Sequence, residues 1–383
     1  MHGRRGPDDL AGAFRKFAVG ARRDGAPRYA RICEGAASDP DLVELVALAP
    51  PDQRRPNILL AAVHHLLLTG VDDALADYYP TVLAWRGIDL VDPMAAGDPF
   101  PPFAAFCARH REAVAELVAT RATQTNEVGR CTAILPALST IASSRDGSPI
   151  ALVDVGAAAG LNLLFDLYAY DYAGAGTAGV AGSPVVLHCE LRDGTVDDDR
   201  GDPPRPPTTL PRVAARVGLD RHPVDVRDDD QALWLLACQW PDHPDRFDTA
   251  RRALSLARSV AEPPVVRSGD AVEDLASVVD MLPDDAHVCV LHSWVAAYFT
   301  PEQQRALGDV VARVASTRAV SWLFAETPYE VPALPVPPPA EERIRGATAV
   351  VLVEQAPGSR RVVRRLADMH SHGRWLRWYG TGR

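Results

Sequence analysis

Two hydrophobic patterns divide the chain near residue 145. Before this point, apolar residues recur every three or four positions, the spacing of amphipathic helices, in segments such as DPDLVELVAL and RRPNILLAAVHHLLLTG. Asp39-Pro40 and Pro50-Pro51 separate these segments, because proline is not tolerated in a helix interior. The pattern predicts an N-terminal helical domain over residues 1–145.

From residue 146 onward, short β-branched runs alternate with helical segments. Runs with strand character cover residues 150–155, 184–191, 263–270, 287–294, 319–326, 348–355 and 360–368. Strands that alternate with helices favour an α/β fold with a mostly parallel sheet. Only residues 356–359 separate the last two runs, which is too short for a parallel crossover and predicts an antiparallel hairpin.

The second domain, residues 146–383, contains a long insertion between its second and third predicted strands. Its first part, RDGTVDDDRGDPPRPPTT, is polar and proline-rich and predicts a loop. The segments LPRVAARVG, DDDQALWLLACQW and PDRFDTARRALSLARSVA have helical spacing. We therefore predict a helical cap inserted at about residues 195–262.

Composition disfavours several classes of partner. The 383 residues carry a formal net charge of −10, which gives no general attraction to nucleic acid or to an anionic membrane surface. No apolar run reaches the roughly 18 residues of a membrane helix, and the N-terminus lacks the apolar segment of a secretory signal. We expect a cytoplasmic protein with a small-molecule substrate; its oligomeric state stays open.

The stretch LVDVGAAAGLNLLFDLY, residues 152–168, joins a predicted strand to a helical pattern through a tight loop. Gly156 permits a turn that a side chain would hinder, and Gly160 permits close approach of a ligand or a helix. Asp154 can accept a charged hydrogen bond from an ammonium group. Because ligands of open parallel sheets bind beyond the carboxyl ends of the strands, this loop predicts a ligand site. A strand–helix turn without a ligand is the alternative.

Five strands with crossovers, a terminal hairpin and the loop D-x-G-x-A-x-G together resemble class I S-adenosylmethionine-dependent methyltransferases. The resemblance covers about residues 150–368. It implies a Rossmann-like sheet of seven strands whose final strand inserts antiparallel. Ala158 stands where dinucleotide-binding loops have their second glycine, which disfavours a nicotinamide cofactor. The whole chain also resembles an actinobacterial family of uncharacterised proteins, which supplies no substrate.

The methyltransferase resemblance implies which loop residues bind S-adenosylmethionine. It places Asp154 and the backbone of Gly156, Ala158 and Gly160 beside the methionyl and ribose parts of the cofactor. Asn162, two positions further on, either caps the following helix or contacts the ligand.

Two further carboxylates fit positions that the resemblance implies. Glu190, at the end of the second predicted strand, would bind the ribose hydroxyls, unless it is a solvated residue at a strand end. Asp270, at the end of the third, would face the adenine amino group, cap the next helix, or do both.

The segment QTNEVGRC, residues 124–131, precedes the first predicted strand. Asn126, Glu127 and Arg130 fall on adjacent helical turns there and could hold the cofactor carboxylate or a substrate. A helix cap followed by a solvated helix face is the alternative.

The end of the fourth strand, which the resemblance places near the reacting methyl group, supplies the catalytic candidates. His292 is either a general base near neutral pH or a hydrogen-bonded core histidine, and Ser293 and Trp294 follow it. Glu326, which ends the fifth strand, lies on the same predicted edge.

His370 and His372 invite a metal-site interpretation, but no third ligand is evident, and we predict no metal. An antiparallel final strand would leave both histidines at the sheet edge opposite the cofactor.

These patterns predict S-adenosylmethionine-dependent methyl transfer to a small-molecule acceptor, with the helical domain and the cap closing over the substrate. Trp234, Trp240 and Tyr298 either line an apolar pocket or pack in the core. A non-catalytic nucleotide-binding sensor or scaffold is the main alternative, because the acidic residues favour binding without proving turnover. A nicotinamide-dependent oxidoreductase is the other alternative.

Overall fold

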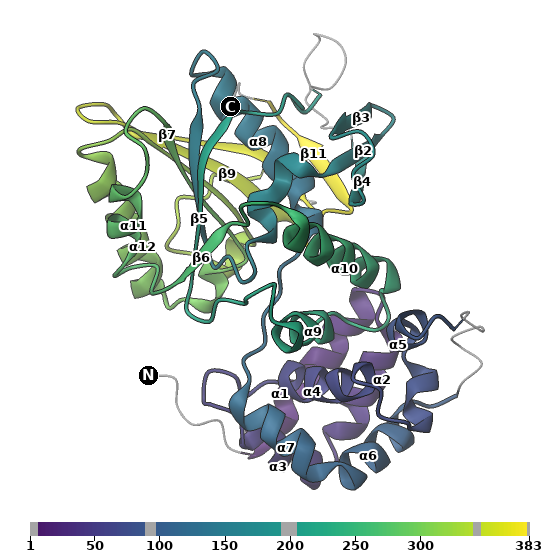
Figure 1. Cartoon of the computed structure of the whole chain (residues 1–383). Helices are drawn as coiled ribbons and strands as arrows, with labels where there is room; N and C mark the ends of the chain where they lie inside the picture. The colour runs from purple at the N-terminus through teal and green to yellow at the C-terminus, as the bar shows by residue number, and fades with distance from the viewer. Residues whose placement is uncertain (1–6, 89–96, 193–204, 340–345, 381–383) are drawn as a thin grey trace. The chain divides into compact units, whose positions relative to one another are not determined.

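The computed structural model describes residues 7–88, 97–192, 205–339 and 346–380. The chain forms two compact units, one made of Met1–Thr125 and Asp225–Arg251 and the other of Asn126–Val224 and Arg252–Arg383 (Figure 1). The division therefore falls at residue 125 rather than at the predicted 145. The helix over Cys131–Ser143, α8, belongs to the second unit, where it contacts two strands.

The first unit is helical, as its pattern predicts. Its helices are α1 (Pro7–Arg23), α2 (Pro27–Ala36), α3 (Pro40–Ala47), α4 (Pro56–Leu68), α5 (Pro80–Trp85), α6 (Phe100–Arg109), α7 (Arg111–Thr120), α9 (Asp229–Ala237) and the first part of α10 (Pro244–Ser259), with the 3-10 helix η1 (Ala74–Tyr78). Several begin with proline, whose missing N–H is harmless in the first turn. Helix α4 is buried almost all round and forms the centre of the unit.

Residues 225–251 belong to the helical unit because buried polar groups bind them there. His64, on α4, donates from Nδ1 to the carbonyl oxygens of Ala237 and Gln239 at 3.0 and 3.1 Å. Asp242 accepts hydrogen bonds from the backbone N–H of Arg28 at 3.0 Å and of Tyr29 at 3.4 Å, in the first turn of α2. Part of the predicted cap is therefore a structural part of the helical unit.

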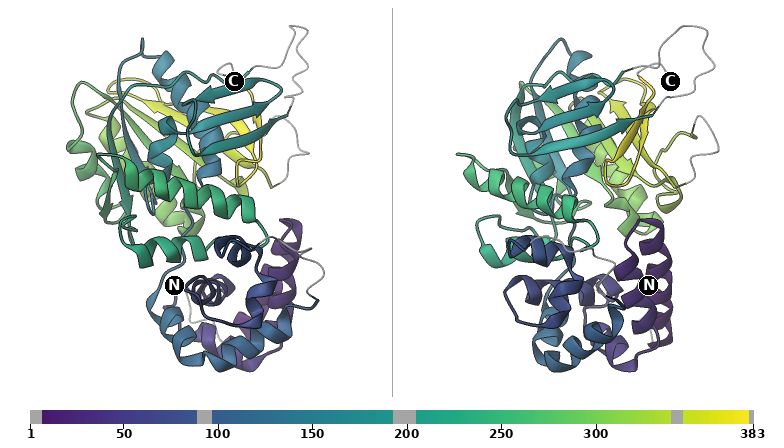
Figure 2. Two further views of the ribbon diagram at one scale, coloured as in Figure 1. Left: turned by 45° about the vertical axis from the view of Figure 1, so that its right-hand side comes forward. Right: turned by 90° about the vertical axis from the view of Figure 1, so that its right-hand side faces the viewer.

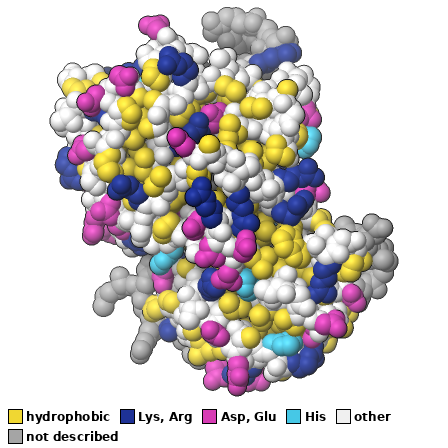
Figure 3. All heavy atoms as spheres, viewed as in Figure 1, with side chains coloured by type: hydrophobic (Ala, Val, Ile, Leu, Met, Phe, Trp, Pro, Cys, Tyr) yellow, Lys and Arg dark blue, Asp and Glu magenta, His cyan; other side chains and the backbone are white. Residues whose placement is uncertain are grey.

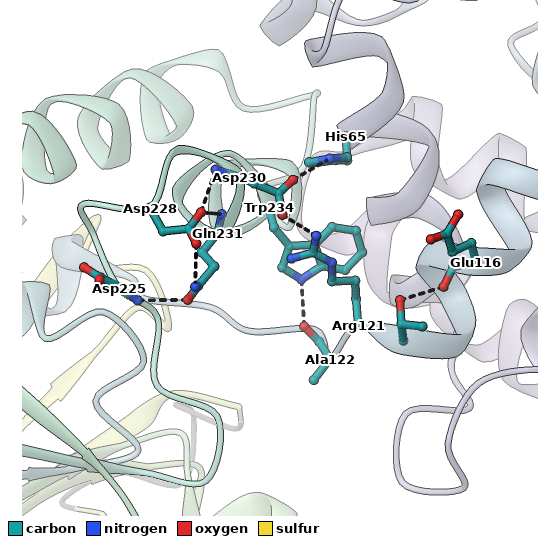
Figure 4. A network of polar contacts seen from close by, with 10 residues as sticks. His65, Glu116, Arg121, Ala122, Asp225, Asp228, Asp230, Gln231 and Trp234 are labelled. Atoms are coloured by element: carbon teal, nitrogen blue, oxygen red, sulfur yellow. Dashed lines mark hydrogen bonds and ion pairs between the residues drawn. The ribbon is translucent and has the colours of Figure 1, made fainter.

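Figure 4 shows a second set of contacts between α9 and the rest of the helical unit. Arg121 and His65 both pair with the Asp230 carboxylate, and the indole N–H of Trp234 donates to the Ala122 carbonyl at 2.8 Å. The Trp234 ring also packs edge-on against His65. Trp240 packs against Phe17 and Tyr29. Of the two alternatives for Trp234 and Trp240, a substrate pocket or core packing, the structure favours core packing.

The second unit is built on one mixed sheet, in the order β3-β2-β4-β11-β10-β9-β8-β7-β1-β5-β6. The strands are β1 (Ile150–Val155), β2 (Ala169–Ala173), β3 (Gly176–Gly179), β4 (Val186–Leu191), β5 (Val213–Asp220), β6 (Val265–Ser268), β7 (His287–Ser293), β8 (Val320–Glu326), β9 (Thr348–Gln355), β10 (Val362–Met369) and β11 (Trp375–Trp378). The strands β2–β4 and β9–β11 lie side by side (Figure 2).

The mostly parallel α/β sheet is confirmed, but it has eleven strands in place of the seven that the resemblance implies. The strands from β6 to β8 are parallel neighbours. On one face, Ala151, Val153 and Val155 of β1 join a core with residues of α11 (Leu275–Asp280) and α12 (Pro301–Ala315). Asp154 points to the other face, because side chains alternate along a strand.

The prediction of a helix over LPRVAARVG is wrong, because this segment contains β5. Its alanine and arginine spacing suits a helix, yet backbone pairing with β1 on one side and β6 on the other favours the extended form. Tertiary pairing of this kind overrides local propensity. Consequently β5, and not the predicted second strand, is the neighbour of β1.

The antiparallel terminal hairpin is confirmed, since β10 pairs antiparallel with β9. The strand inserted antiparallel beside β8 is β9, however, and not the final strand of the hairpin. Two reversals give β10 the direction of β8, so Met369 ends at the same sheet edge as Glu326. The expectation that His370 and His372 lie at the opposite edge is therefore wrong.

No helix within the described ranges is long and apolar enough to cross a membrane. Acidic and basic side chains are interspersed on the molecular face drawn in Figure 3.

Acid should destabilise the helical unit through His64. Burial lowers the pKa of His64 to about 4, while an unfolded histidine has a pKa of about 6.5. The unfolded state therefore takes up a proton first as the pH falls below about 6.5. His64 should therefore lower the free energy of unfolding by about 2 kcal/mol between pH 7 and pH 5, measured by urea titration as the difference between wild type and His64→Gln. The His64→Gln variant should lose most of this pH dependence, and His188→Asn, at an exposed histidine, should retain it.

Candidate functional site

The loop after β1 has a strained backbone that its glycines make possible. Gly156, Ala158 and Gly160 have φ values of +73°, +50° and +72°. A Cβ atom on Gly156 would overlap the Val295 side chain, so glycine is required there by packing as well as by conformation. Ala158 is the one non-glycine of the three, and its N–H donates to the Asp220 carboxylate at 2.8 Å.

The N–H groups of this loop are all used within the protein. Those of Gly156 and Ala157 face the Leu219 carbonyl at 2.7 and 3.5 Å. Asn126 Oδ1 accepts from the N–H groups of Ala159 and Leu161 at 3.2 and 3.0 Å. The remaining N–H, of Gly160, bonds within the loop to Ala157. The loop therefore offers a ligand no free row of backbone donors.

Asn126 and Asn162 are thus structural supports of the loop. Asn126 is 4% exposed and fixes the loop through its side-chain oxygen. Asn162 is equally buried in the 3-10 helix η4 (Leu161–Leu167), and its Oδ1 lies 3.5 Å from the Cys131 thiol. Asn162 makes no helix-capping hydrogen bond, because Gly160 occupies the cap position.

Asp154 is a buried carboxyl group beside this loop. It is 2% exposed, and its Oδ2 finds no hydrogen-bond donor in the described part of the chain. Burial raises the pKa of Asp154 to about 8; the Asp220 charge adds to this rise and the Arg130 charge opposes it. A carboxyl group held in this way is costly for the fold and is suited to a cationic ligand.

Sequence reasoning missed Asp220, the carboxylate that does end the neighbouring strand. Leu219 pairs with Val155, so Asp220 follows at the carboxyl end of β5 next to the loop. Its Oδ1 accepts from His222 N at 2.8 Å, and its Oδ2 accepts from Ala158. The available signal was the aspartate that ends the segment VAARVGLD, and interpreting this segment as a helix concealed it.

Glu190 does not reach this site. It lies on β4, which is separated from β1 in the sheet by β11, β10, β9, β8 and β7. Strand β4 runs opposite in direction to β1, and its register with β11 and β10 puts Glu190 beside the level of Met369, at the same sheet edge as the β1 loop but with five strands between. The Glu190 side chain is 60% exposed and pairs with Arg192. Glu190 is therefore a solvated residue at a strand end, the alternative to ribose binding.

Asp270 follows β6 and caps the turn after it. Its Oδ1 accepts from Val272 N at 2.8 Å, and Arg221 pairs with its Oδ2. Partial burial raises the pKa of Asp270, but the hydrogen bonds from Arg221 and Val272 outweigh burial and lower the pKa. Asp270 thus caps a turn and not the next helix, because α11 begins at Leu275 with Asp274 at its N-cap position.

Arg130 joins three segments at the carboxyl edge. Its Nη1 donates to the carbonyl and hydroxyl oxygens of Ser293 at 3.0 and 3.2 Å, and its Nε donates to the Ser371 carbonyl at 3.0 Å. The guanidinium also lies 5.7 Å from the centre of the Trp294 ring. Trp294 has a φ of +56°, which is rare for a bulky residue and typical of functional sites.

His292 and Glu326 form a buried pair on the opposite sheet face from Asp154, because His292 pairs with Val155 in the register. His292 is fully buried; its Nδ1 lies 2.8 Å from Glu326 Oε1, and its ring stacks on Phe324. Glu326 also accepts from the N–H groups after Trp294 and so holds that turn. This geometry fits a hydrogen-bonded core histidine better than a general base.

The structure therefore gathers some predicted residues and separates others. At the carboxyl edge it brings together the loop from Gly156 to Gly160, Asp154, Asn126, Arg130, Ser293 and Asp270. Tyr298 is 64% exposed and does not pack in the core. Within the described residues, no group of three or more histidine, cysteine or acidic side chains is arranged to hold a metal.

Fold and site define a mixed α/β protein with a polar site at the carboxyl ends of β1, β5 and β7. The chain belongs to a family described as an uncharacterized protein conserved in bacteria (DUF2332), which it matches over residues 11–378. This match spans residues of both units. Neither a curated protein nor a solved structure matched the chain.

Replacing Asp154 with Asn should stabilise the ligand-free protein at pH 8. An unfolded aspartate ionises near pH 4, whereas Asp154 holds its proton to about pH 8, so the ionisable group destabilises the fold increasingly across that interval. We expect the variant to gain a few kcal/mol in urea unfolding at pH 8, on the order of 2–4, and little near pH 4. Asp171→Asn, on β2 with a side chain 43% exposed, is the control. Lower stability of Asp154→Asn at pH 8 would contradict this account.

Proposed function

We propose that the protein is a cytoplasmic S-adenosylmethionine-dependent methyltransferase that acts on a small-molecule acceptor. The observation that carries the proposal is the pairing of a buried, unpartnered Asp154 carboxyl with a loop whose N–H groups are already bonded. S-adenosylmethionine, when bound, supplies a methyl group that is activated as a sulfonium.

The loop chemistry distinguishes between ligand classes. Dinucleotide-binding loops present free backbone N–H groups and a helix N-terminus to a pyrophosphate. Here Asn126, Asp220 and Leu219 accept those hydrogen bonds, and two carboxylates lie beside the loop. An anionic pyrophosphate would meet repulsion and no free donors. A phosphate-free ligand with a cationic group suits this loop better, which disfavours a nicotinamide cofactor.

The residues at this edge complement the amino-acid end and the nucleoside of S-adenosylmethionine. Asp154 would bind the ammonium group through charged hydrogen bonds, and the Arg130 charge would favour the carboxylate. Asp220, which ends β5, would bind the ribose hydroxyls in the role predicted for Glu190, and Asp270, which follows β6, would face the adenine. Asn126 and Asp220 hold the loop in the shape that this binding needs.

A non-catalytic sensor or scaffold would bind the same ligand with the same residues. The two functions differ only in turnover, so binding has to be measured first and methyl transfer second.

Isothermal titration calorimetry with S-adenosylmethionine and S-adenosylhomocysteine tests the proposal. We expect wild type to bind both, and Asp154→Asn and Asp220→Asn each to weaken binding at least tenfold, about 1.4 kcal/mol, because each removes a charged acceptor. Glu190→Gln is the matched control, and it should bind like wild type because five strands separate β4 from β1 and the Glu190 side chain is 60% exposed. Absence of binding to a folded wild type, or binding of NADH in its place, would contradict the proposal.

A further inference from the structure

The segment His370–Gly373 is fixed against the start of α8 by several contacts. Ser371 and Gly373 accept hydrogen bonds through their carbonyl oxygens, from Arg130 Nε at 3.0 Å and from Thr132 Oγ1 at 3.2 Å. A Cβ atom on Gly373 would overlap the Gly129 backbone, and the φ of Gly373 is +74°. Glycine thus lets the two backbones touch, and the segment has one defined position at the carboxyl edge.

The Glu127 carboxylate and the His372 imidazole lie in contact across this junction. Glu127 Oε2 lies 3.1 Å from His372 Nδ1, and Glu127 Oε1 accepts from Gly129 N at 3.2 Å. The Glu127 side chain is 6% exposed and that of His372 is 19% exposed. A buried carboxylate therefore lies beside Nδ1 of an imidazole that is still partly exposed, and Nε2 is the ring nitrogen on the far side from the carboxylate.

The neighbouring histidines are less suited to proton transfer. His292 is fully buried behind the Phe324 ring, so an acceptor from solvent cannot reach it without rearrangement. His370 accepts the backbone N–H of His372 through Nδ1 at 3.1 Å, which supports the turn. His372 alone combines an orienting carboxylate, partial exposure and a position beside the Arg130 contacts.

Arg130 connects this pair to the candidate cofactor site. The same guanidinium that bonds to Ser371 also bonds to Ser293 at the end of β7, and its charge opposes the rise in the pKa of Asp154. The histidine turn and the β1 loop are thus contacted or influenced by one side chain.

We propose that His372 is the general base of this site and that Glu127 positions it, an inference that rests on the proposed methyl transfer. The neutral imidazole takes a proton from the acceptor at Nε2 as the acceptor's electron pair forms the bond to the methyl carbon. The carbon–sulfur bond breaks and its electron pair stays on sulfur. The acceptor class is therefore one whose nucleophile carries a removable proton, a hydroxyl or an ammonium.

An acceptor-independent measurement uses the histidine ring signals in NMR spectra of the full chain. We expect the His372 signal, assigned with His372→Asn, to shift when S-adenosylhomocysteine binds, because a base must lie beside the reacting group. The His287 signal should not move, since His287 lies at the amino end of β7, at the opposite sheet edge, with its Nε2 2.8 Å from Ser321 Oγ. If signals of the β1 loop shift and the His372 signal does not, His372 is not the general base, while the proposed methyl transfer is unaffected. No binding at all would overturn both.

Transfer of labelled methyl from S-adenosylmethionine to a panel of small alcohols, phenols and amines provides the second readout. His372→Asn should lower kcat about 100-fold with the S-adenosylhomocysteine affinity unchanged. Added imidazole should restore part of the activity to His372→Ala, which a purely structural role does not predict. Glu127→Gln should lower kcat about tenfold at unchanged KM, and His188→Asn should match wild type. Full activity of His372→Asn, or no transfer by a cofactor-binding wild type, would overturn the inference.

Discussion

A carboxyl group buried without a protein partner is the constraint on which the carboxyl edge of this sheet depends. Asp154 is enclosed by its strand neighbours and faces the charges of Asp220 and Arg130. Desolvation keeps its pKa near 8, and such a group is unfavourable for folding once it ionises. Proteins retain groups of this kind mainly where a ligand uses them. The surrounding loop, strand β5 and Arg130 are arranged around this one group.

The direction of the terminal hairpin is the second feature that determines which residues lie at the carboxyl edge. Because β9 pairs with β8, the chain returns in β10 to the carboxyl edge, and His372 reaches Glu127 and the residues near Arg130. Had the final strand been inserted beside β8, the same histidines would have ended at the opposite edge. Sheet order, more than any local motif, therefore decides which polar residues meet.

The sequence correctly brings the β1 loop, Asp154, Asn126 and Arg130 to one sheet edge, because glycine spacing, strand ends and an adjacent polar segment are local signals; their binding of a cofactor stays a prediction. It does not predict β5 and Asp220, since alanine and arginine at helical spacing conceal a strand that pairing with β1 and β6 stabilises. Glu190 was misplaced for the same reason: the strand next in sequence is not the strand next in the sheet. The position of His292 could be determined only from the register of the sheet, which puts this residue on the face opposite Asp154.

The measurement that tests the account most directly is proton exchange on ligand binding. S-adenosylhomocysteine would be titrated into the protein at pH 7 by calorimetry in two buffers with different ionisation enthalpies. If Asp154 is protonated in the free protein and ionised against a bound ammonium, binding should release most of one proton, and Asp154→Asn should release none. Binding without proton release, or equal release by the variant, would contradict the central role of this carboxyl group.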